Sequence, residues 1–183
     1  VMKMSGMRHN VRRRLAALAA SGCLLLSVSA SGFAQEACTG FNWPLNTEIG
    51  WMGAADSEAV ATGATVPAPL AKAVTLTLKP SKSETLPVVS GVKKQAVGGE
   101  SFSGWFTIDK IEKGGTYQVS LSKDGWIDVA QEGKLVDSTA FTGNHECKSI
   151  RKSVRYELAP GSALIQIVGA PADIIKVTVR EAN

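Results

Sequence analysis

Apolar and polar residues alternate over short segments through the C-terminal two-thirds of the chain. In Thr116–Ser122, Tyr117, Val119 and Leu121 share one side and polar residues occupy the other. Alternation with a period of two is typical of a strand that buries one face and exposes the other. The pattern predicts eight strands, which are Ala73–Lys79, Thr85–Ser90, Gly104–Ile108, Thr116–Ser122, Trp126–Ala130, Val154–Leu158, Ala163–Val168 and Ile174–Arg180.

The segments between these strands carry turn signals, in which glycine adjoins lysine, aspartate, asparagine or proline. These turns are Lys113–Gly115, Lys123–Gly125, Glu132–Lys134, Thr142–Asn144 and Ala159–Gly161. Connections this short exclude the crossover helices that a parallel βαβ fold needs. We therefore expect an all-β protein, an antiparallel β-sandwich of about eight strands.

The stretch before the strands has a different character. Asn46 is a suitable N-cap with Glu48 in the first turn, so we expect one short helix over Thr47–Ala54. Ala55–Pro69 is rich in Ala, Gly, Thr and Pro without a period, and we expect a loop there. This gives a helix and loop segment over residues 35–69 and a sandwich domain over residues 70–183.

The first 34 residues have the pattern of an export leader. Arg12–Arg14 is followed by the apolar stretch Leu15–Val28, and small residues then lead to Ala34 before Gln35. We expect residues 1–34 to be a cleaved signal peptide, with cleavage after Ala30 as the alternative. Lipidation at Cys23 is a further alternative. The apolar stretch is too short to span a bilayer, so we expect no transmembrane segment in the mature chain and a periplasmic or secreted protein.

The charge distribution argues against nucleic-acid binding. The chain has 183 residues with 20 basic and 16 acidic side chains, a net charge of +4, and five of the basic ones lie in residues 1–34, which contain no acid. Without those five the balance is 15 basic to 16 acidic, a net of −1. The remaining charges are interspersed and form no stripe that would follow a phosphate backbone.

The cysteines fit the same destination. Once Cys23 leaves with the leader, Cys38 and Cys147 are the two that remain. An even pair in an exported protein predicts one disulfide, which would tie the mature N-terminus to a late segment. The alternative is two free, buried thiols.

The residue inventory limits the chemistry that the mature chain can perform. His145 is its single histidine, because His9 lies in the leader, and there is no Walker or Gly-x-Gly-x-x-Gly sequence. Iron or zinc sites with two or three histidines therefore lack ligands within one subunit. Three acids could imitate a calcium site, and they are Asp124, Asp128 and Asp137. The favoured interpretation is that they are ordinary acids in turns. We expect no catalytic, cofactor-binding or metal-ligating residues.

Tryptophan and arginine supply the candidate ligand contacts. Trp43 and Trp51 flank the predicted helix and either dock it onto the sandwich or line a groove, whereas Trp105 and Trp126 lie within strand patterns and are expected in the core. Arg151 and Arg155 belong to a late basic cluster that is either a solvated strand face or an anion contact. The candidate contacts are Trp43, Trp51, His145, Arg151 and Arg155.

Five further segments stand out, and they are Ala37–Trp43, Gly115–Ser120, Gly125–Val129, Cys147–Val154 and Leu158–Gly161. Together they resemble a family of small exported proteobacterial proteins, some of which carry a homogentisate 1,2-dioxygenase label. The Gly115–Val119 strand and the final strands also look like the jelly-roll domains of the pre-peptidase C-terminal type. That second likeness implies a non-catalytic accessory module and a sandwich of jelly-roll type. The dioxygenase label would require iron held by two histidines and a glutamate, for which His145 alone is present.

We therefore expect an exported, non-enzymatic sandwich that binds a ligand or a protein of the cell envelope. The alternative from another class is a small secreted enzyme that uses His145, and a third possibility is a structural envelope protein with no small ligand.

Overall fold

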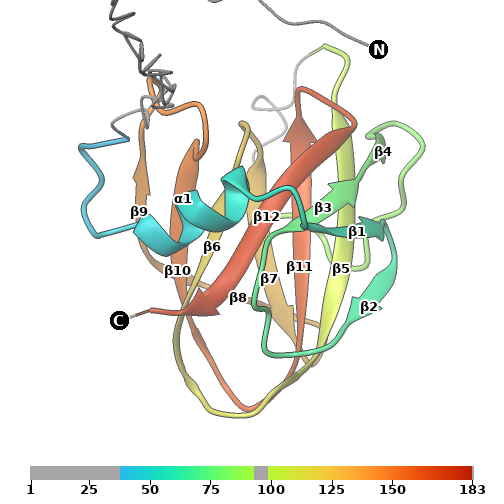
Figure 1. The fold of residues 1–183 in the computed structure, drawn as a ribbon. Coiled ribbons are helices and arrows are strands. Elements are labelled where there is room, and N and C mark those ends of the chain that lie inside the picture. The colour runs from blue at the N-terminus through green and yellow to red at the C-terminus, as the bar shows by residue number, and fades with distance from the viewer. Residues whose placement is uncertain (1–37, 93–98, 183) are drawn as a thin grey trace, which may run out of the picture. The chain divides into compact units, whose positions relative to one another are not determined.

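Residues 38–92 and 99–182 are described by a computed structural model, in which two sheets pack face to face (Figure 1). The predicted signal peptide, residues 1–34, lies outside the described residues. The described residues form one helix and twelve strands. Their bounds are α1 Asn46–Gly53, β1 Glu58–Ala61, β2 Ala64–Val66, β3 Val74–Thr77, β4 Lys79–Pro80, β5 Phe102–Ile111, β6 Gly115–Leu121, β7 Trp126–Gln131, β8 Lys134–Val136, β9 Ser138–Gly143, β10 Lys152–Leu158, β11 Gly161–Ala170 and β12 Ile174–Glu181.

Each sheet has six strands, and the chain passes repeatedly from one sheet to the other. The first sheet has the order β1-β3-β12-β6-β10-β9, and the second has the order β2-β5-β11-β7-β8 with β4 beside β5. Asp137 alone separates β8 at the edge of the second sheet from β9 at the edge of the first. The two sheet edges that this residue joins therefore lie at the same side of the sandwich.

The inward positions of both sheets form one apolar core. Val119 and Leu121 of β6 alternate with polar neighbours and are fully buried, as are Ile165 and Ile167 of β11 and Phe106 of β5. This is the burial that alternation predicts for a strand with one face in the core. The prediction of a β-sandwich is confirmed in its coarse form.

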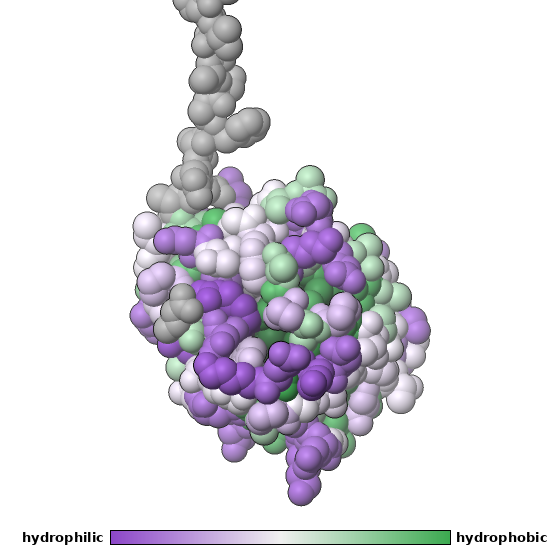
Figure 2. Space-filling view, turned by 60° about the horizontal axis from the view of Figure 1, so that its bottom comes forward, coloured by the Kyte–Doolittle hydropathy of each residue, from purple (hydrophilic) through white to green (hydrophobic). Residues whose placement is uncertain are grey.

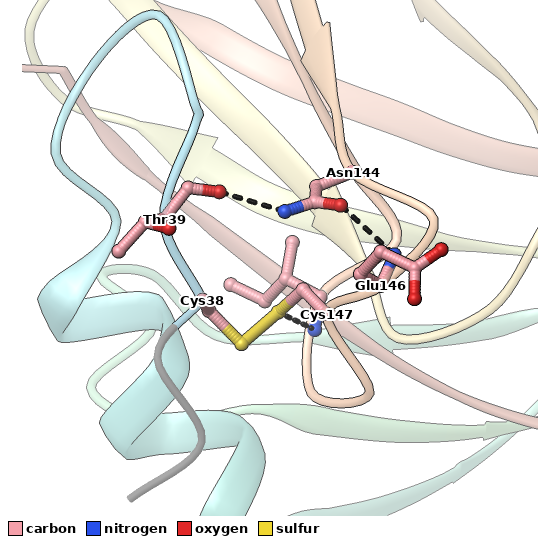
Figure 3. Close-up of a disulfide and its surroundings, with 6 residues drawn as sticks. Cys38, Thr39, Asn144, Glu146 and Cys147 are labelled. Atoms are coloured by element: carbon pink, nitrogen blue, oxygen red, sulfur yellow. Dashed lines mark hydrogen bonds between the residues drawn. A yellow bond between two sulfur atoms is a disulfide. The ribbon is translucent and has the colours of Figure 1, made fainter.

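The N-terminal segment covers the outer face of the first sheet, where α1 crosses β12 and β6 (Figure 1). A second, smaller apolar cluster lies there and includes Leu45, Met52 and Ile150. The predicted disulfide is confirmed, because Cys38 is bonded to Cys147, and the nearby Asn144 side chain donates to the Thr39 carbonyl at 2.7 Å (Figure 3). One covalent bond and one apolar cluster thus hold this segment on the sheet.

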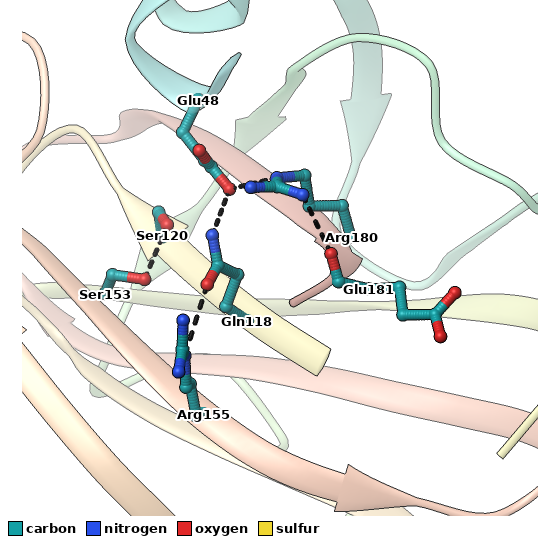
Figure 4. Close-up of polar contacts among 7 residues, drawn as sticks. All are labelled: Glu48, Gln118, Ser120, Ser153, Arg155, Arg180 and Glu181. Atoms are coloured by element: carbon teal, nitrogen blue, oxygen red, sulfur yellow. Dashed lines mark hydrogen bonds and ion pairs between the residues drawn. The ribbon is translucent and has the colours of Figure 1, made fainter. Parts of the chain in front are cut away.

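Under α1 lies a buried polar network (Figure 4). The Glu48 carboxylate of α1 is fully buried, pairs with Arg180 of β12 and accepts a hydrogen bond from the Gln118 amide of β6. On the neighbouring strand pair, Ser120 donates to Ser153 at 2.9 Å. These residues alternate with core positions along their strands, and they are buried because the N-terminal segment covers them.

Four details of the predicted fold are wrong. The described residues form twelve strands instead of eight, and the sheets are mixed, because β1 pairs with β3 and β2 pairs with β5 in parallel. The segment Ala55–Pro69 contains β1 and β2 instead of being wholly loop. The helix begins at Asn46 itself, Leu45 is the N-cap, and no side chain caps it. The two short strands escaped detection since each buries a single valine, Val60 or Val66.

The predicted strand Thr85–Ser90 is also wrong, because this segment forms no strand. It lies against the outer face of the second sheet, where side chains satisfy its backbone. The Gln166 amide of β11 bonds both the N–H and the carbonyl of Val88, and Asp128 of β7 accepts from the N–H of Gly91 at 3.2 Å. Backbone groups with such partners need no neighbouring strand.

Candidate functional site

Two of the predicted contact residues, Trp43 and Arg155, lie together on the covered outer face of the first sheet. The Arg155 guanidinium lies 4.2 Å from the centroid of the Trp43 ring, and its Nε donates to the Gln118 side chain at 3.3 Å. Trp43 and Trp51 are both half-buried against the second apolar cluster. Of the two alternatives for these tryptophans, the geometry matches docking of the N-terminal segment.

The remaining predicted contacts, Arg151 and His145, are not part of the contact between Trp43 and Arg155. Arg151 is engaged by Asp124, whose carboxylate lies 2.9 Å from the arginine Nε. His145 is exposed in the connection between β9 and β10, two residues from the disulfide. Within residues 38–92 and 99–182, no group of three His, Cys, Asp or Glu side chains is placed to hold a metal ion.

Asp128, one of the three acids considered for calcium, already has protein partners. Its carboxylate is buried and accepts hydrogen bonds from the Trp126 indole at 2.7 Å, from the Gly91 N–H at 3.2 Å and from the Gln166 amide at 3.1 Å. Three donors satisfy a buried carboxylate without a cation. Asp128 therefore holds the Trp126 ring in place.

An apolar groove lies at the side of the sandwich where β8 and β9 form the sheet edges. We call it the edge groove, and its volume is about 260 Å³. The seven lining residues come from β7, β9 and β10, and they are Trp126, Ile127, Ser138, Phe141, Lys152, Val154 and Tyr156. Trp126 is 42% exposed and Phe141 is 73% exposed, which corrects the expectation that Trp126 packs in the core.

The groove exists because the sheet edges are uneven. β8 pairs only with Val129, Ala130 and Gln131 of β7, so the end of β7 that carries Trp126 has no β8 neighbour. A second hollow of about 220 Å³ continues past this end, shares Trp126 and Tyr156 with the groove, and adds Leu135, which is 43% exposed. An incomplete edge thus leaves large apolar side chains open to solvent.

One cation and one phenol give the groove its polar character. Lys152 is half-buried on β10, and its amine lies 5.7 Å from the centroid of the Trp126 ring. Burial lowers the pKa of Lys152, and the nearby Asp124 acts in the opposite direction. Burial also raises the pKa of Tyr156, whose hydroxyl donates to the Ile127 carbonyl at 3.0 Å. The phenol is therefore a neutral structural group, and the ammonium is the free charge.

A separate hollow, which we call the end hollow, opens at the end of the sandwich, where Figure 2 shows apolar side chains inside a polar rim. Its volume is about 190 Å³, and Leu70, Ile108 and Val179 line it. The cations at its rim are already paired: Lys110 with Glu112 at 3.9 Å, Lys113 with Glu181 at 3.1 Å, and Arg180 with the buried Glu48. This end hollow has no unpaired charge to recognise a ligand, so the edge groove is the better candidate.

The alternation of residues in the sequence indicates one lining residue of the edge groove, Lys152. Lys152 is two residues before Val154 and four before Tyr156, so alternation places a lysine on an apolar strand face. Phe141 carried no such signal, because Ser138–Gly143 shows little apolar periodicity and was not predicted as a strand. None of the five predicted contact residues lines the groove.

Two of the five segments that carry the predicted family resemblance, Gly115–Ser120 and Gly125–Val129, largely overlap the strands β6 and β7. Both strands contribute side chains to the core. A likeness in core strands bears on the fold more than on chemistry, so the family resemblance stays a prediction. The chain matches no protein-family model and no curated protein.

Proposed function

We propose that this protein is an exported, non-enzymatic β-sandwich of jelly-roll type that binds a small apolar ligand in the edge groove. One observation carries the proposal. Among the described residues, five large apolar side chains are substantially exposed, and three of them, Trp126, Leu135 and Phe141, line the edge groove and the hollow that continues it. Exposed apolar side chains that gather in one concave place mark binding sites more often than scattered ones do.

The jelly-roll assignment is supported by the path of the chain. Of the eleven connections between successive described strands, eight pass from one sheet to the other, and β4 to β5, β7 to β8 and β9 to β10 stay within a sheet. Repeated passage between two facing sheets is typical of jelly rolls. The two parallel pairs at the far edge are additions to that plan.

Export is supported by the leader pattern in residues 1–34 together with a disulfide, since disulfides persist in oxidising compartments. When the full chain is expressed in a Gram-negative host, we expect the protein in the periplasmic fraction with Gln35 as its first residue. N-terminal sequencing and Ellman's reagent check this, and no free thiol should react before reduction. A cytosolic protein with both thiols reactive would contradict export.

The enzyme alternative depends on His145, which is exposed and lies outside the edge groove. Metal analysis of the purified protein separates the two readings. Stoichiometric iron together with oxygen uptake on homogentisate would replace the binding proposal by the enzyme.

Binding in the edge groove can be tested with the neutral fluorescent probe Nile red. We expect Phe141→Ala to weaken binding of the dye about tenfold, since losing the contact of one aromatic ring costs roughly 1.4 kcal/mol or more. Phe141 is largely exposed, so its loss should leave the stability of the fold almost unchanged. Fluorescence titration of the full-chain product measures the affinity.

The matched control is Ile174→Ala, which removes an exposed apolar side chain from β12, outside the edge groove. We expect this variant to bind the dye as the parent does. If the two variants lose affinity equally, or if the parent does not bind the dye, the groove is not the binding site.

A further inference from the structure

We propose that the edge groove selects small amphipathic monocarboxylates, with the apolar body against Phe141 and Trp126 and the carboxylate at the amine of Lys152. The proposal rests on the proposed function of the same groove and adds the chemical class of its ligand.

The Lys152 side chain points into the edge groove. Lys152, Val154 and Tyr156 alternate along β10, and all three line the edge groove. Their intervening neighbour Ser153 is on the opposite face, where its hydroxyl accepts from Ser120. The lysine therefore enters the groove beside the core residues of its strand, and its ammonium stands over the face of the Trp126 indole.

Among the described residues, the Lys152 ammonium has no carboxylate that pairs with it alone. Asp124 is the nearby acid that favours its charge, and Asp124 is already engaged by Arg151 at 2.9 Å. The amine instead faces the Trp126 ring, whose centroid lies 5.7 Å away. A ring face compensates a buried charge only in part, whereas a carboxylate adds a charge-assisted hydrogen bond.

The lowered pKa of Lys152 agrees with an ammonium that lacks a countercharge. Burial is the largest cause of the shift, so the charged form of Lys152 is under-solvated in the groove. An arriving carboxylate supplies a countercharge in a site whose other lining residues, apart from Ser138, are aliphatic or aromatic. In such surroundings an ion pair is stronger than it is in bulk water.

The remaining polar groups restrict the ligand to one negative charge. The Tyr156 hydroxyl is committed to the Ile127 carbonyl, and the Asp128 carboxylate is held by three donors. Asp137, which is exposed, lines the adjoining hollow and would repel a second anionic group there. One free cation, an apolar wall and an acid beyond it fit a monocarboxylate better than a dicarboxylate.

The dimensions favour a small molecule. The edge groove of about 260 Å³ and the hollow of about 220 Å³ share lining residues. Together they fall in the range of roughly 300–1,000 Å³ that is typical of small-molecule sites. A chain of about eight carbons or one phenyl ring with a short acidic tail is of suitable size.

Isothermal titration calorimetry on the full-chain product tests the assignment with two pairs of probes, octanoate with octanamide and 4-phenylbutyrate with its amide. Each pair keeps the apolar body and removes the charge. We expect the acid of at least one pair to bind tenfold or more tightly than its amide. Equal affinities for acid and amide, or no binding of either acid, would overturn the carboxylate assignment.

Variants then locate the charge. We expect Lys152→Met to abolish the preference for the acid and Lys152→Arg to retain it. The matched control is Lys134→Met, which removes an exposed lysine of β8 outside the groove and should keep the preference. The comparison of acid with amide in the parent does not depend on the folding of any variant.

Failure of this assignment is distinguishable from failure of the proposed function. If Nile red binds in a Phe141-dependent manner while acid and amide bind equally, the groove is an apolar site without charge selection. If the dye also fails to bind, the proposed function falls together with the ligand class.

Discussion

Replacing both Cys38 and Cys147 with alanine is expected to lower the free energy of unfolding by about 4–5 kcal/mol. The bond joins residues that are 109 positions apart, so it removes much conformational freedom from the unfolded chain. In the chain-entropy model the stabilisation grows with the logarithm of the loop length, which gives this bond a value near the top of the usual range. The bond also fixes the N-terminal segment on the first sheet.

Guanidinium unfolding followed by far-ultraviolet circular dichroism and tryptophan fluorescence measures the effect. The parent protein after reduction is the control, and it should match the alanine variant, because Cys147 is small and its truncation alone removes little apolar contact. A loss below about 1 kcal/mol would mean that the bond restrains the unfolded chain far less than its loop length predicts.

The central strands were predictable because local alternation and tertiary burial agree there. In β6, Tyr117, Val119 and Leu121 alternate with polar residues, and the inward set packs in the core. The second sheet shows the same agreement in β11, where Ile165 and Ile167 are inward. Where one face of a strand is buried, the sequence period is enough to find it.

The segment Thr85–Ser90 shows where this reasoning ends. The segment is apolar enough to resemble a strand, but Val88 and Val89 are adjacent and Pro87 interrupts the run, which is a local argument against a paired strand. Gln166, 78 positions from Val88, bonds the backbone that a neighbouring strand would otherwise pair, and this distant contact is not contained in any local pattern. The same applies to β1 and β2, whose pairing partners lie elsewhere in the chain.

The candidate site was harder to predict than the fold. Trp43 and Arg155, which were predicted as ligand contacts, contact each other on a covered face, 4.2 Å apart, and neither lines the edge groove. The edge groove depends on β8 being shorter than its neighbour β7, which leaves Trp126 without a β8 neighbour, although it pairs with Val168 of β11 on its other side. Strand lengths at a sheet edge are set by the whole topology, so the exposed Phe141 could not be found from its own surroundings.

Replacing Glu48 with alanine is expected to cost about 3–5 kcal/mol of unfolding free energy. The Glu48 carboxylate is fully buried, and it is the partner of both the Arg180 guanidinium and the Gln118 amide. Its removal leaves a largely buried cation and a fully buried amide donor without their acceptor. Uncompensated burial of a charge is among the costliest single changes in a protein.

A double replacement separates the charge from the packing. We expect the double variant with Glu48→Met and Arg180→Met to recover most of the loss, since apolar residues of similar length replace a buried ion pair at little cost. The Gln118 amide still lacks its acceptor in this variant, so recovery should stop about 1–3 kcal/mol short of the parent. Guanidinium unfolding of the parent, both single variants and the double variant gives the coupling between the two side chains.

Glu112→Ala is the matched control, because Glu112 is exposed and its carboxylate Oε1 lies 3.9 Å from the Nζ of Lys110. Exposed ion pairs contribute little, so this change should stay within about 0.5 kcal/mol of the parent. If Glu48→Ala costs no more than Glu112→Ala, the carboxylate under α1 is not a structural charge. The difference between the two glutamates arises from burial: the same side chain stabilises the fold strongly where the N-terminal segment excludes water and hardly at all where solvent screens it.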